Sequence, residues 1–153
     1  MRPRTRGRSY AVVVRSDFAY RFRGLLGGLA ADLVAECDPP DSEAGFSLQI
    51  DRRVHLALPK GINWRDAAWL SFGLAAHAPE LMNLKPGGMI VRVVSFTFPL
   101  ADFRSEVAAL AMDGWLRREF DLPDRGFGVS LGEGGGNYSF RWGGIESPFS
   151  DDS

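Results

Sequence analysis

The sequence predicts a single α+β domain, built from one mostly antiparallel sheet with three helices packed on it. Three observations lead to this prediction. The chain has 153 residues, which suits one domain with a substantial core. Short runs of alternating apolar and polar residues indicate strands, and longer runs with apolar residues three or four positions apart indicate helices. Together they give the order β-α-β-β-α-β-α-β-β, in which the first six elements match the ferredoxin-like arrangement.

The first strand is expected at Tyr10–Asp17, a short valine-rich run. The stretch 18–37 then predicts a helix, because its large apolar residues recur at helical spacing. These residues are Phe18, Phe22, Leu25, Leu26, Leu29 and Leu33. Ser16 or Asp17 could cap the start of this helix, and Pro39 forbids its continuation.

Two alternating runs follow, at 46–50 and 54–58, and the charged tripeptide between them suggests a hairpin. Asn63 is then expected to cap a helix over 64–84. Ala78–Pro79 is expected to divide that helix into a long and a short piece, since the residue before a proline avoids the helical conformation.

The helix over 64–84 is apolar on all sides. Between residues 67 and 76 its only polar side chain is Ser71. A helix of this kind is buried on more than one side. One side would pack on the sheet, and the second could be covered by the preceding helix or by another subunit.

Arg65, Trp69 and Phe72 are the predicted partner-binding residues of this helix. Exposed aromatic and arginine side chains are frequent anchors of protein interfaces. We therefore expect a small non-enzymatic protein-binding module that acts through an apolar and aromatic helix surface, on another protein or by self-association, for instance as a homodimer. A stand-alone inhibitor or an immunity-type protein would fit this description.

The last third of the chain predicts one strand, one helix and one hairpin. The run 89–98 is apolar on both faces, which is typical of a central strand, and a third helix is expected over 100–120. Two alternating runs, 127–131 and 137–142, then flank the glycine-rich segment Gly132–Gly136. Phosphate-binding loops place a helix after their glycines, whereas a strand-like run follows here. The segment therefore predicts the turn of a β-hairpin.

The residue types that carry most catalysis and metal binding are scarce. His55 lies on a predicted strand and is expected to point to solvent, and His77 is expected to bind carbonyls at the end of its helix. Cys37, expected at the end of the first helix, stands between two acidic residues, which disfavour the thiolate form. None of the three has metal-ligand spacing with another. The sequence predicts no catalytic, metal-binding or cofactor-binding residue, and it leans against an enzyme.

Charge is unevenly distributed along the chain. Residues 1–23 contain seven arginines and one aspartate, and the rest contains eleven basic and eighteen acidic residues. We expect a flexible basic arm at 1–9, a domain at 10–145 and a flexible acidic tail at 146–153. The basic start has no apolar segment before a cleavage site, and no run is long enough to cross a membrane, so a cytoplasmic location without membrane contact is expected.

Two other functions are left open by the sequence. A small enzyme or ligand-binding protein would need a pocket between helices and sheet, lined by buried carboxylates or by His55. Nucleic-acid binding would depend on the arginines of the arm. The rest of the chain supplies no matching basic face, so a nucleic-acid partner is not expected.

Overall fold

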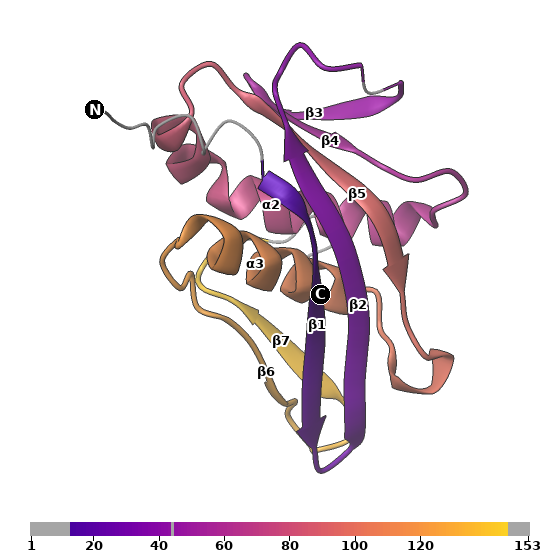
Figure 1. Ribbon diagram of the computed structural model, residues 1–153. Coiled ribbons are helices and arrows are strands. Elements are labelled where there is room, and N and C mark those ends of the chain that lie inside the picture. Colours follow the sequence, from indigo (N-terminus) through magenta and orange to yellow (C-terminus); the bar gives the residue numbers. More distant parts are fainter. Residues whose placement is uncertain (1–12, 44, 147–153) are drawn as a thin grey trace.

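The computed structural model of the protein describes residues 13–43 and 45–146 (Figure 1). The predicted arm at 1–9 and the predicted tail beyond residue 146 lie outside the described residues. The elements are β1 (Val13–Gly24), β2 (Gly27–Asp38), β3 (Ser47–Asp51), β4 (Val54–Ala57), α2 (Trp64–Leu84), β5 (Met89–Thr97), the 3-10 turn η2 (Leu100–Asp102), α3 (Val107–Phe120), β6 (Phe127–Leu131) and β7 (Tyr138–Trp142).

Strands β1 to β5 form one sheet in the order β1-β2-β5-β4-β3. Neighbouring strands are antiparallel except β4 and β5, which are parallel and are joined by α2. Strands β6 and β7 form a separate antiparallel hairpin. The fold is α+β with a mostly antiparallel sheet, as predicted. The described residues contain two α-helices rather than three, in the order β-β-β-β-α-β-α-β-β.

The helix predicted over 18–37 is wrong, because this stretch forms most of β1 and β2. Apolar residues four positions apart fit a period of two as well as a period near 3.6, so the pattern suits both structures. In β2 every second residue is buried: Leu29, Ala31, Leu33, Ala35 and Cys37. Leu25 and Leu26, which complete the apparent helical stripe, are 87% and 43% exposed at the turn between the strands. Gly27, at a φ of +106°, helps the chain reverse there.

Helix α2 begins as predicted, since Oδ1 of Asn63 accepts a hydrogen bond of 2.8 Å from the backbone N–H of Arg65. Pro79 does not divide the helix, which continues for more than a turn beyond it. A proline removes one helical hydrogen bond, here the bond to the carbonyl of Ala75. Leu81, fully buried beyond the proline, holds the last turn against the core.

The third predicted helix is shorter than expected. Residues 100–102 form the separate turn η2, and α3 begins only at Val107. The rings of Phe98 and Phe103 stack with centroids 3.6 Å apart, and both also contact the ring of Phe96. This aromatic packing holds the segment between β5 and α3 as a compact loop.

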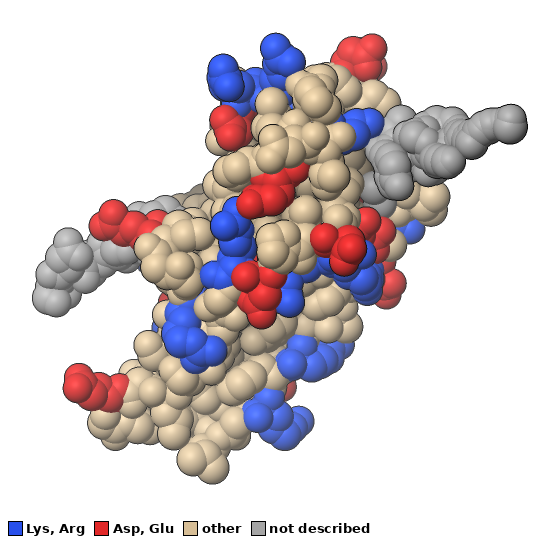
Figure 2. Space-filling model, turned by 90° about the vertical axis from the view of Figure 1, so that its left-hand side faces the viewer, with Lys and Arg blue, Asp and Glu red and all other residues tan. Residues whose placement is uncertain are grey.

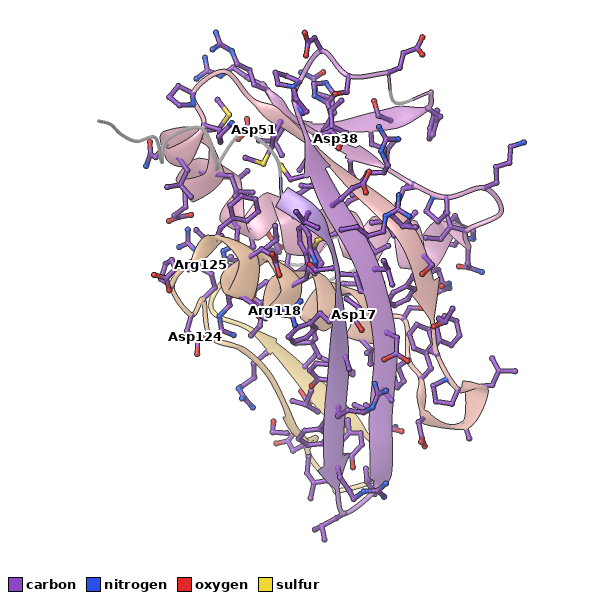
Figure 3. The ribbon with its side chains drawn as sticks, viewed as in Figure 1. Asp17, Asp38, Asp51, Arg118, Asp124 and Arg125 are labelled. Carbon is purple, nitrogen blue, oxygen red and sulfur yellow. The ribbon has the colours of Figure 1, made fainter. Side chains whose placement is uncertain are left out.

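Both helices pack on the same face of the sheet, with α3 against β1 and β2 and α2 against β3 and β4 (Figure 1). Hydrogen bonds from two side chains of α3 connect this helix to the edge strand β1. The guanidinium of Arg118 donates to the backbone oxygen of Asp17 (Figure 3). The indole N–H of Trp115, itself fully buried, donates to Oγ of Ser16 over 3.0 Å. The sheet therefore has one face covered by helices.

The hairpin predicted around Gly132–Gly136 is confirmed. Gly134 and Gly135 have φ values of +87° and +73°, which residues with a side chain rarely adopt. Tyr138 of β7 ties this hairpin to the β1–β2 turn, because its hydroxyl donates to the carbonyl oxygen of Gly27 over 2.6 Å. The glycines make a turn, and a strand rather than a helix follows them.

Candidate functional site

The predicted partner-binding residues of α2 fall into two environments. Trp69 and Phe72 are buried, at 5% and 8% exposure, whereas Arg65 is exposed. The exposed aromatic patch expected from the sequence is therefore not formed by these two rings. The β6–β7 hairpin of the same chain covers them. Trp69 stacks on Trp142 with ring centroids 5.2 Å apart, and Phe72 stacks on Phe127 at 5.6 Å. This side of α2 needs no second subunit to bury it.

The open side of α2 consists of smaller residues. Trp64, Ala68, Ser71, Ala75 and Pro79 follow one another at intervals of three or four, so they share one side of the helix. Trp64, Ala75 and Pro79 are exposed, and the other two are half-buried. This strip was not predicted from the sequence, where the large aromatic residues of the helix drew the prediction to another side. The spacing of three or four positions between its residues is nevertheless visible in the sequence. Trp64, which is 64% exposed, is the aromatic residue at its start.

Two adjoining hollows of about 430 and 440 Å³ lie along this strip. Both are lined by Phe72, Ala75 and Glu146. We call them together the α2 groove. Its floor is the side of α2 from residue 68 to residue 79. Gln49 and Ile50 of β3 line the first hollow, Arg125 and Ile145 line the second, and Glu146 lines both.

The α2 groove carries little uncompensated charge. Arg125, in the segment between α3 and β6, forms an ion pair with Glu80 of α2 (Figure 3). Glu146 is exposed and forms no ion pair with any residue in the described part of the chain. On the floor, Pro79 lacks the N–H that would bond the carbonyl of Ala75 in an uninterrupted helix. The groove is thus mainly apolar. It carries the negative charge of Glu146 on its rim, and the backbone carbonyl of Ala75 on its floor has no helical N–H to accept from.

The strongest buried polar contact lies elsewhere, between α2 and α3. Nε2 of His77 is 2.7 Å from Oδ1 of Asp113, and both side chains are at least 95% buried. The other carboxylate oxygen of Asp113 accepts from Arg117 over 3.3 Å. His77 was expected to bind carbonyls at a helix end, but it lies within α2 and pairs with the facing helix. At this depth the pair cannot reach a dissolved substrate unless the helices separate, so we assign it to helix packing.

Two more titratable groups are buried. Burial raises the pKa of the Cys37 thiol to about 12, so the thiol stays protonated and is a poor nucleophile. Cys37 lies in β2 rather than at a helix end, with its sulfur 3.6 Å from that of Met89. Burial also raises the pKa of Asp66, in the first turn of α2, although a hydrogen bond with Ser105 acts in the opposite direction. His55, which was expected to point to solvent, is half-buried in β4.

Several charges on the sheet are paired across neighbouring strands. Arg21 pairs with Asp32 at 2.9 Å, and Arg92 pairs with Asp38 at 2.8 Å. Figure 2 shows acidic and basic side chains intermixed across the face that it presents, with no continuous basic surface there. The arginines of the N-terminal arm lie outside the described residues, so nucleic-acid binding through that arm stays a prediction.

No protein-family model matches the chain, and no curated protein matches it. Within residues 13–43 and 45–146, no group of three or more His, Cys, Asp or Glu side chains could hold a metal ion. In the same part of the chain, no helix is long and apolar enough to cross a membrane.

Proposed function

We propose that the protein is a small protein-binding module and that the α2 groove is its contact surface. The observation that carries this proposal is the pair of adjoining hollows along one exposed, small-residue side of an otherwise buried helix. The proposal keeps the helix that the sequence singled out. It moves the contact from the buried rings of Trp69 and Phe72 to the neighbouring strip of α2, where Trp64 and Ala75 are exposed. Phe72 lies at the border of this strip and lines both hollows.

The shape of the groove favours a protein segment over a compact ligand. The floor from Ala68 to Pro79 is about 16 Å long at 1.5 Å per residue. Small-molecule sites usually enclose most of their ligand and place several polar groups around it. Here the floor is open, and Ala75 and Pro79 are exposed within it. A long, shallow and apolar surface of this kind suits an extended partner.

An enzymatic or ligand-binding role between helices and sheet has less support. The groups that could carry proton transfer there, His77 and Asp113, are paired with each other and buried between the helices. The thiol of Cys37 is protonated at neutral pH. Neither hollow of the α2 groove is lined by a histidine or a cysteine.

The proposal is tested by placing a bulky charge on the groove floor. The full-length chain and its Ala75→Arg variant are used as baits in lysate of the native cells, and captured proteins are quantified by mass spectrometry. We expect at least one protein to be captured by the unmodified chain and reduced tenfold or more by the substitution. Ala75 is exposed on a helix, where arginine is well tolerated, so the variant should fold.

The matched control is Ala101→Arg, the same substitution at an exposed alanine of η2, which lines neither hollow. It should capture the same proteins as the unmodified chain. Equal capture by the unmodified chain and Ala75→Arg would remove the α2 groove as the contact surface.

A further inference from the structure

The α2 groove borders a free edge of the sheet. Strand β3 is the last strand on its side, and it pairs only with β4 among the described residues. A strand at the end of a sheet presents backbone N–H and C=O groups that lack ladder partners. Gln49 and Ile50 of this edge strand line the same hollow as Ala68, Ser71 and Ala75 of α2. A segment that occupies the hollow therefore contacts both α2 and residues of the edge strand.

The residues of the groove indicate what such a segment would look like. Apart from Phe72 at its border, the floor is built from alanine, serine and proline, whose small side chains leave room for larger apolar side chains pointing toward α2. Arg125 is already paired with Glu80, whereas Glu146 on the rim has no partner among the described residues. A basic side chain of the partner would complement Glu146. Backbone groups of the partner would complement those of β3.

The regular part of this edge is short. β3 has five residues, and its register with β4 shifts between Gln49 and Asp51. Bulges and short lengths are common on edge strands, where they limit uncontrolled pairing. The edge can therefore accept about three to five residues of a partner strand, which suits a specific short motif rather than an extended sheet-to-sheet association.

Building on the proposed function, we infer that the partner is a protein segment in extended conformation that adds a strand to β3 and lies along α2. Its side chains alternate, with large apolar residues directed at the floor of the α2 groove. It carries a lysine or arginine opposite Glu146. Recognition thus combines main-chain hydrogen bonds at the sheet edge with side-chain pockets on the helix.

The test uses a random peptide library selected on the immobilised full-length chain. The strongest peptide is then synthesised with a single N-methyl group at each backbone amide in turn, and its affinity is measured by fluorescence anisotropy. If the peptide adds a strand to β3, the effect of N-methylation on affinity should alternate from one residue to the next. N-methylation at every second residue, where the N–H faces β3, should weaken binding tenfold or more, and at intervening residues it should change affinity less than twofold.

Two substitutions and one control locate the bound peptide on the protein. Ala75→Arg should weaken binding tenfold or more and Ala101→Arg should leave it unchanged. Glu146→Gln should weaken peptides that carry a basic residue more than peptides in which that residue is replaced by alanine.

Strand addition would be overturned if N-methylation lowered the affinity equally at every residue, or if its effect recurred every three to four residues. A selection that enriches no peptide would overturn it too. These results differ from failure of the proposed function, which is measured separately by capture of native proteins. Capture that is lost in Ala75→Arg, together with a scan in which the effect does not alternate, would leave the α2 groove as the contact surface with a partner of another conformation.

Discussion

Two sides of α2 have the same apolar character and different surroundings. On one side, Trp69 and Phe72 are covered by the rings of the β6–β7 hairpin. On the other side, Ala68, Ser71 and Ala75 form the floor of the α2 groove. At the middle of the helix, the two large rings are covered within the chain, whereas Ala75 stays exposed.

Side-chain size bears on this difference, because at the middle of the helix the covered side carries two rings and the exposed strip carries alanine and serine. A buried aromatic ring removes a large apolar area from water, so covering it stabilises the fold by several times more than covering an alanine. An exposed alanine strip costs little and leaves a smooth surface on which another chain can lie. The first of three sets of variants tests this contrast directly, and the other two test the buried polar groups that lie in or against α2.

The largest effect is expected on the covered side. Trp69→Ala removes a buried ring that stacks on Trp142 and meets Phe72 edge-on, and it leaves a cavity between helix and hairpin. We expect a loss of about 3–5 kcal/mol in the free energy of unfolding, measured by denaturant titration. Trp64→Ala is the control, because that ring is 64% exposed, and it should cost less than about 1 kcal/mol. Equal losses in the two variants would contradict the contrast.

The side of α2 that faces α3 should show the next largest effect. Asp113→Ala leaves Nε2 of His77 buried without its partner at 2.7 Å. We expect a loss of about 3 kcal/mol in the free energy of unfolding. The double variant His77→Leu/Asp113→Leu should recover most of it, because replacing both partners removes the unsatisfied group. A double variant less stable than Asp113→Ala would show that an unsatisfied His77 is not the cause of the loss.

The smallest effect concerns Asp66, in the first turn of α2. Burial raises its pKa in the folded protein above the ordinary value of 3.8. The folded state therefore holds this proton more tightly than the unfolded state. The stability contributed by the protonated form is fully present below pH 3.8 and is lost as pH rises through the raised pKa.

The side chain at this position does not titrate in the Asp66→Asn variant, so the variant should not lose this stability as pH rises. The free energy of unfolding of the unmodified chain, relative to the variant, should fall as pH rises from 3.8 and then level off. Denaturant titrations of both proteins across this range measure the difference. Parallel stability curves would show that the environment of Asp66 does not favour its protonated form.

Sequence reasoning succeeded where local chemistry decides the structure. Asn63 caps α2, and the glycines of Gly132–Gly136 provide the positive φ values of a hairpin turn. It failed over 18–37, where the spacing of the apolar residues fits both a helix and a strand. The choice there depends on β5, which pairs with β2 and lies more than fifty residues further along the chain.

The candidate site was predicted only in part. An apolar helix at 64–84 is present, and it carries the α2 groove, but the residues chosen on it are mostly covered. No local pattern shows that Phe127 and Trp142 return to cover Phe72 and Trp69. The smaller strip carries no composition signal of its own, since alanine is common in any helix.

The turns, the cap of α2, the β6–β7 hairpin and the apolar character of α2 could be predicted from the sequence, because each depends on neighbours within a few residues. Long-range contacts set the rest: 18–37 forms a hairpin, one side of α2 is covered, and His77 meets Asp113 thirty-six residues away. Local propensities differ by about 1 kcal/mol per residue or less. Burial of a single large side chain is worth more, so long-range packing decides wherever local patterns are ambiguous.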